Sequence, residues 1–252
     1  KSFEILKKYP NCILRYVKVD EKYFDNFPIS FWVTVQTWFR TKISELCPDL
    51  DRVLYLDCDT IVRDKLDELF TIDLSSNIIA GIPDICGIKS HTKYLKITDN
   101  EYFNAGVLLL NCTEWRNQGI FEKIKEFAIN NKKLLKCSDQ DALNKIADNK
   151  KYKLDQKYDY METWWRRYYN EYENEGLIQY IDAGKNPAIV HFTGLKPQYY
   201  NCFNSFKNEW WEYAKNLDSV DELYNKFLED EKIFKNECRT ATIIKFLFYK
   251  IL

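Results

Sequence analysis

The most constraining feature of this sequence is an apolar run that ends in two aspartates one residue apart. Val53 to Leu56 predicts a buried strand, and Asp57, Cys58 and Asp59 follow it. Side chains two positions apart in an extended chain point the same way, so both carboxylates should reach one place while Cys58 points to the opposite face. Two carboxylates that close repel each other unless a cation lies between them, and such ligands suit Mg²⁺ or Mn²⁺. The alternative is a strand that ends in a turn with two solvated aspartates.

Composition places the chain among globular proteins and narrows its partners. The 252 residues are 46% hydrophobic and 30% charged, which supports a sizeable core and argues against disorder. The net charge of −1 gives no reason to expect nucleic-acid binding. Glycine is sparse, at 7 residues, and no glycine-rich phosphate-loop pattern occurs. Metal and side chains would therefore have to hold any phosphate.

The eight cysteines contain no C-x-x-C pair, which argues against a structural zinc site. They are scattered and mostly neighbour apolar residues, so we expect buried free thiols in a reducing cytosol. No apolar run reaches the length of a membrane-spanning helix. These features predict a cytoplasmic protein.

Alternating strand and helix patterns predict an α/β fold with a mainly parallel sheet flanked by helices. The expected strands are residues 12–19, 53–56, 78–83, 106–110 and 188–192. The expected helices are residues 34–46 (capped by Ser30 or Thr34), 113–130, 140–147, 205–216 and 220–228, and residues 2–8 resemble the end of another. We expect a catalytic domain over 1–216 and a C-terminal helical extension over 217–252.

Four blocks of sequence carry a family resemblance: residues 52–62, 103–111, 139–144 and 191–197. In this order they resemble the retaining nucleotide-sugar glycosyltransferases of family 8, which include glycogenin, galactinol synthase and bacterial lipooligosaccharide galactosyl- and glucosyltransferases. The resemblance implies a GT-A-type fold. It also implies transfer of glucose or galactose from a UDP-hexose donor to a saccharide or glycolipid acceptor, with Mn²⁺ or Mg²⁺ as cofactor. A role in bacterial lipooligosaccharide or surface-glycan synthesis would follow.

The amino end departs from the family pattern. The family has an earlier β-α-β segment that supplies uracil and ribose contacts, and nothing here matches it. Because Lys1 already lies inside a helical pattern, we expect this sequence to lack about one such unit at its amino end.

The resemblance assigns metal and donor contacts to specific residues. Asp57, Asp59 and His191 would bind the divalent cation. Arg40, Asn104, Gly194 and Lys196 would contact the donor, together with the two aspartates. A glycine permits close approach to a diphosphate, and a lysine supplies a compact positive charge. For Arg40 the alternative is an arginine on a helix surface, and His91 is expected at the surface.

The segment Asp139-Gln140-Asp141 matches the family's residues beneath the anomeric carbon of the donor sugar. By resemblance Asp139 would bind sugar hydroxyls, Gln140 would stabilise an oxocarbenium-like transition state, and Asp141 completes the candidate catalytic set. The alternative for Asp139 is the N-cap of the helix that follows. Asp84 matches an acidic residue near the acceptor in bacterial members.

Two other functions remain open from the sequence: an inactive nucleotide-sugar-binding fragment and a metal-dependent hydrolase. The carboxyl end adds an expected partner. Residues 239–252 combine seven large apolar side chains with Arg239, Lys245 and Lys250, a pattern that predicts peripheral contact with the inner face of a membrane. The alternative is a last helix packed on the domain.

Overall fold

The structure is a computed structural model that describes residues 10–29, 34–168, 170, 174–216 and 220–237. Its contacts divide the chain into two compact units. The larger unit comprises residues 11–160 and 167–191, and the smaller unit comprises residues 1–10, 161–166 and 192–252.

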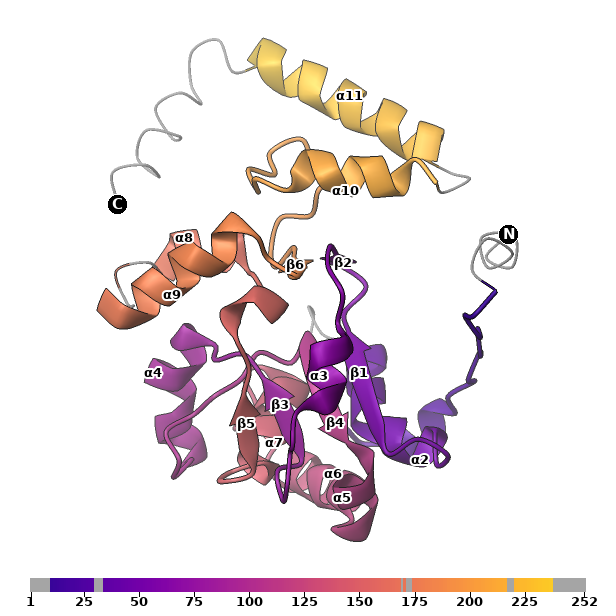
Figure 1. Cartoon of the computed structure of the whole chain (residues 1–252), viewed down its shortest axis with the longest axis vertical. Helices are drawn as coiled ribbons and strands as arrows, with labels where there is room; N and C mark the ends of the chain where they lie inside the picture. Colours follow the sequence, from indigo (N-terminus) through magenta and orange to yellow (C-terminus); the bar gives the residue numbers. More distant parts are fainter. Residues whose placement is uncertain (1–9, 30–33, 169, 171–173, 217–219, 238–252) are drawn as a thin grey trace. The chain divides into compact units, whose positions relative to one another are not determined.

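A four-stranded mixed sheet forms the centre of the larger unit (Figure 1). In spatial order its strands are β1 (Arg52–Leu56), β4 (Val107–Asn111), β3 (Ile79–Gly81) and β5 (Lys151–Lys153). Strand β4 is antiparallel to both β1 and β3, while β3 and β5 are parallel. Three of these four strands therefore run in one direction, as expected, and β4 runs against them. The predicted α/β fold is confirmed.

Strand β4 is buried on both faces, which explains its unbroken apolar sequence. Leu108 and Leu110 join one core cluster, and Leu109 points into a second cluster on the other face. The first cluster includes Trp38, Trp115 and Phe121, and the second includes Leu69, Tyr158 and Ala188. The sheet is thus covered on both sides.

Helices connect the strands of the larger unit. They are η1 (Glu21–Phe24), η2 (Val35–Lys42), α2 (Ile43–Leu46), α3 (Asp67–Thr71), α4 (Ile85–Leu95), α5 (Cys112–Asn117), α6 (Ile120–Asn130), α7 (Ser138–Ile146), η3 (Gln156–Tyr158) and α9 (Asn174–Lys185). The helix expected over 34–46 begins after Thr34, but most of it is a 3₁₀-helix. Helix α8 (Glu162–Tyr168) includes residues of both units.

A second, two-stranded sheet lies in the larger unit. Strand β2 (Thr60–Val62) pairs antiparallel with β6 (Ile189–His191), and Thr60 lies opposite His191. The expected late strand is therefore present, although its partner was not predicted. This register matters because β2 follows Asp59 directly.

Helices α10 (Lys207–Ala214) and α11 (Val220–Glu237) belong to the smaller unit. They meet through aromatic contacts, with the rings of Trp211 and Phe227 5.3 Å apart. Both helices were expected, and α11 is longer than predicted. The expected membrane-binding segment 239–252, the helix end at 2–8 and the cap at Ser30 lie outside the described residues. Across the described ranges, no helix combines the length and apolar character that crossing a membrane requires.

The single helix expected over 113–130 is divided into α5 and α6, and two further expectations were wrong. Residues 12–19 form no strand: Ile13 is 96% exposed and Tyr16 is 67% exposed, and the described part of the chain pairs no strand with them. An extended segment without a neighbouring strand cannot form a ladder. Of the cysteines that the structure describes, Cys112 and Cys202 are buried as expected, but Cys12, Cys58 and Cys137 are exposed.

Candidate metal and sugar-nucleotide site

The end of β1 and the end of β6 bring two carboxylates and an imidazole together. The backbone N–H of Asp57 donates to the Gly106 carbonyl at 2.7 Å, and the turn that follows leads into β2 beside His191. His191 Nε2 lies 3.4 Å from Asp59 Oδ1 and 3.9 Å from Asp57 Oδ2. One donor atom from each of these three residues lies within 4.8 Å of the others, so the group can hold a metal ion.

Asp159 sets the orientation of the His191 ring. Both side chains are buried, and His191 Nδ1 lies 2.9 Å from Asp159 Oδ1. Burial alone lowers the pKa of His191, but Asp159 and Asp59 outweigh burial and raise it to about 10. With Nδ1–H donated to Asp159, Nε2 faces the two aspartates, the arrangement that metal-binding histidines commonly show. The donor set fits a divalent cation.

Gly106 leaves the space that His191 occupies. A Cβ at this position would lie 2.1 Å from His191 Cε1 and 2.9 Å from Asp57 Oδ2. Those distances are well inside van der Waals contact, so a side chain here would displace the imidazole or the carboxylate. The close approach of the backbone therefore requires glycine at this position.

Arg40 is buried between carboxylates rather than exposed on a helix surface. Its Nη2 lies 3.0 Å from Asp57 Oδ1, and its Nε lies 3.1 Å from Asp139 Oδ2. Its Nη1 also donates to the Ala105 carbonyl. Tyr55 adds a second support, because its hydroxyl donates to Asp57 Oδ1 at 2.5 Å. Arg40 thus links the candidate metal-binding group to α7.

The three candidate catalytic residues of α7 point to different neighbours, because successive helical positions turn by about 100°. Asp139 pairs with Arg40. Gln140 accepts the Ala105 N–H at 2.9 Å and donates to Asp84 Oδ2 at 3.1 Å. Asp141 is directed elsewhere and accepts five hydrogen bonds. Both carboxylate oxygens of Asp141 are therefore occupied by hydrogen bonds within the protein.

Asp139 is not the N-cap of α7, as one alternative held. The helix begins at Ser138 with Cys137 at the cap, and Asp139 lies within the first turn. Burial raises the pKa of Asp139 to about 6, against the opposing attraction of Arg40. The Asp139 carboxyl therefore changes its protonation state near pH 6, beside the Arg40 guanidinium.

Asp84 and Asn104 complete this side of the site. Asp84 caps α4 by accepting the Gly87 N–H at 3.2 Å, and its other oxygen accepts the Gln140 amide. Asn104 is buried, and its Oδ1 accepts the Gly106 N–H at 2.8 Å. Both residues therefore hold neighbours of the candidate metal-binding group in place.

Gly194 and Lys196 belong to the smaller unit, so their contact with a donor stays a prediction. Gly194 adopts a left-handed conformation with φ of 79°, which suits glycine. Lys196 Nζ donates to the Phe192 carbonyl at 2.9 Å.

Sequence reasoning missed some residues and misplaced another. Asp159 and Tyr55 support the site, but the sequence around them gives no signal of that contact. His91 was expected at the surface, yet its side chain is only 12% exposed and lies 2.7 Å from Asp141 Oδ1.

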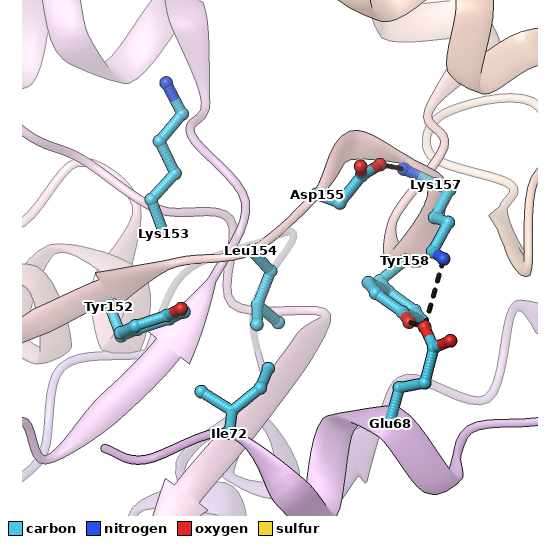
Figure 2. A pocket seen from close by; sticks show the side chains of 8 residues that line it. All are labelled: Glu68, Ile72, Tyr152, Lys153, Leu154, Asp155, Lys157 and Tyr158. Carbon is cyan, nitrogen blue, oxygen red and sulfur yellow. Dashed lines mark hydrogen bonds and ion pairs between the residues drawn. The ribbon is translucent and has the colours of Figure 1, made fainter. Parts of the chain in front are cut away.

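A separate pocket involves residues from α3, β5 and η3, where Glu68 accepts hydrogen bonds from Lys157 and Tyr158 (Figure 2). None of the candidate site residues lines it.

Comparison with solved structures defines the class of protein as a glycosyltransferase with a GT-A fold. The chain is similar to the galactosyltransferase LgtC, solved in complex with donor and acceptor sugar analogs, with a TM-score of 0.72 and 28% identity over 84% of this chain and 78% of that one. The sequence model of glycosyl transferase family 8 matches residues 1–202. The chain belongs to this family.

Two curated relatives match most of this chain. General stress protein A of Bacillus subtilis is 30% identical over 207 residues, which is 79% of this chain and 72% of that protein. The lipopolysaccharide 1,2-glucosyltransferase of Escherichia coli is 25% identical over 88% of this chain and 63% of its own length. The chain spans less than half of matching glycosyltransferases from Haemophilus influenzae and Streptococcus pneumoniae, at 44%, 48% and 41% of their lengths.

Proposed function

We propose that this glycosyltransferase is metal-dependent and moves glucose or galactose from a UDP-sugar to a saccharide or glycolipid acceptor, with retention at the anomeric carbon. The proposed setting is bacterial lipooligosaccharide or surface-glycan synthesis at the cytoplasmic face of a membrane. The observation that carries the proposal is the group formed by Asp57, Asp59 and His191 in a family 8 chain.

Relatives support the substrate class. LgtC is a galactosyltransferase solved with donor and acceptor sugar analogs, and the Escherichia coli relative is a lipopolysaccharide glucosyltransferase. Both names describe hexose transfer. We therefore propose a hexose donor here and leave glucose and galactose as the two candidates.

Asp57, Asp59 and His191 would hold Mn²⁺ or Mg²⁺. When bound, the cation would supply charge neutralisation for the departing diphosphate. Arg40 keeps Asp57 in place, and Asp159 fixes the imidazole through Nδ1. The chain thus organises the cation site with ion pairs and hydrogen bonds before substrate arrives.

Gln140 would present a neutral amide beneath the sugar. Its oxygen and nitrogen are fixed by the Ala105 N–H and by Asp84. A fixed dipole requires little reorganisation as positive charge develops on the sugar ring. Because an amide is a poor nucleophile, we propose front-face attack by the acceptor, guided by the leaving phosphate.

Calorimetric titration with UDP tests the metal dependence. We expect UDP to bind tightly with Mn²⁺ and weakly after chelation. Asp59→Asn should abolish both the metal-dependent binding and transfer, because it removes a charged ligand. Asp64→Asn makes the same chemical change at an exposed aspartate and should behave like the parent. Full transfer by Asp59→Asn would contradict the metal assignment.

Two further measurements separate the other functions. A hydrolase would release free hexose from the UDP-sugar at the same rate with and without acceptor, and an inactive fragment would bind UDP and release nothing.

For Gln140→Ala we expect turnover to fall far more than UDP affinity, as for a group acting mainly in the transition state. An equal loss of UDP affinity would assign Gln140 a structural role.

A further inference from the structure

An exposed cysteine faces a histidine at the start of α7. Cys137 Sγ lies 3.9 Å from His91 Nε2, and His91 Nδ1 lies 2.7 Å from the fully buried Asp141. These three residues, which we call the Cys137 cluster, come from α4 and α7 of the larger unit. In this arrangement Cys137 corresponds to a nucleophile, His91 to its base, and Asp141 to the carboxylate that orients the imidazole.

The hydrogen bonds define which ring nitrogen carries a proton. Tyr94 donates its hydroxyl hydrogen to Asp141 Oδ2 at 2.9 Å, and its oxygen lies 2.5 Å from His91 Nδ1. Both neighbours of Nδ1 can therefore accept a proton from it, and Nδ1 is the protonated nitrogen. Nε2 is left to take the thiol proton of Cys137.

The surroundings favour the resulting charge pair. Burial tends to raise the pKa of Asp141, but the hydrogen bonds from His91, Tyr102 and the Cys137 N–H outweigh it and keep that pKa below its ordinary value. An ionised Asp141 stabilises an imidazolium. Cys137 occupies the N-cap of a nine-residue helix, where a negative charge is stabilised.

We infer that Cys137 is a reactive thiol, a modification site for hydroperoxides and soft alkylating agents that the transferase reaction does not use. The Cys137 sulfur attacks one peroxide oxygen, an S–O bond forms and the O–O bond breaks. The departing hydroxide takes the Nε2 proton of His91 and leaves as water. Sulfur is oxidised by two electrons to a sulfenic acid, and the peroxide is reduced.

The intact reduced chain provides its own comparison. Cys12 and Cys58 are also exposed, so limiting iodoacetamide at about pH 6.5, where unassisted thiols are almost wholly protonated, reports the thiolate fraction at each position. We expect Cys137 to be alkylated at least about tenfold faster than either, as measured by peptide mass spectrometry. Hydrogen peroxide followed by a dimedone trap should label Cys137 first.

His91→Gln tests the base directly. The variant should reduce the alkylation rate of Cys137 about tenfold and leave the rate at Cys12 unchanged. The buried Cys112 should stay protected from alkylation, which shows that the fold is intact. If Cys137 of the unmodified chain reacts no faster than Cys12 and Cys58, the inference is wrong, whatever the variant does. An unchanged Cys137 rate in His91→Gln would equally overturn it.

Discussion

At the scale of single residues, Arg40 balances the negative charge of this site. Three carboxylates, Asp57, Asp59 and Asp139, lie around one guanidinium and the His191 ring. The arginine pairs with two of them and is itself nearly buried, so its own desolvation is offset by both partners. Asp59 has His191 as its cationic neighbour, and a metal ion would take over that role.

Gly106→Ala should damage the candidate metal site more than the fold. The new methyl group would overlap His191 Cε1, and the ring cannot move freely because Asp159 holds it. We expect Mn²⁺ affinity to fall at least about tenfold and stability to fall by about 1–3 kcal/mol. Calorimetry and urea denaturation measure the two effects.

Gly119→Ala is the matched control for that substitution. Gly119 has φ of 60° and no atom within 4 Å of an added Cβ, so alanine there adds strain of about 1–2 kcal/mol without touching the site. Mn²⁺ affinity should stay that of the parent. A Gly106→Ala protein with undiminished Mn²⁺ affinity would show that the ring is free to move.

Asp139→Asn should change how stability depends on pH. Asp139 has a folded pKa of about 6, above its ordinary value, so the folded state holds this proton more tightly than the unfolded state. The stabilisation from Asp139 is therefore complete only below the ordinary aspartate pKa of about 3.9, and it is lost as the pH rises through about 6. Measured without metal, Asp139→Asn should gain stability relative to the parent over that range. A difference independent of pH would refute this.

At the scale of elements, Gly119 divides a predicted helix into two. Residues 113–130 predict a single helix, yet α5 ends at Asn117 and α6 begins at Ile120. Gly119 adopts a left-handed conformation between them. The break redirects the chain so that Trp115 and Phe121 both reach the first core cluster.

Strand β4 should be the most sensitive element of the larger unit. Leu109 is fully buried in the second core cluster, so Leu109→Ala should cost about 2–5 kcal/mol. Leu50→Ala removes the same atoms from a side chain that is 38% exposed and should cost less than about 1 kcal/mol. Urea denaturation followed by tryptophan fluorescence measures both, and equal costs would contradict the assignment of β4 to the core.

At the scale of the whole molecule, the sequence predicted features encoded by local patterns. The run before Asp57, the apolar strands and the family blocks predicted the α/β fold and the candidate site residues. The direction of β4 could not be predicted from the sequence, because a buried parallel strand and a buried antiparallel strand can have the same apolar sequence. The contact of Asp159 with His191 was equally hidden, since it depends on how distant segments align and no local pattern records it.

The short pairing of β2 with β6 has a consequence for motion in the larger unit. More than half of the chain lies between Asp57 and His191, and strands of only three residues join the two ends of that long loop. Such a ladder should open locally far more often than β4. A cation bound by residues of both ends would oppose opening, because it binds the closed form alone.

Hydrogen exchange would detect this closure. With Mg²⁺, the backbone amides of β2 and β6 should exchange more slowly, while the amides of β4 should exchange at an unchanged rate. Asp59→Asn should remove the difference, and equal slowing throughout the chain would point to general stabilisation instead. A bound metal ion would then have a second role in this protein, because it would determine how long β2 and β6 stay paired.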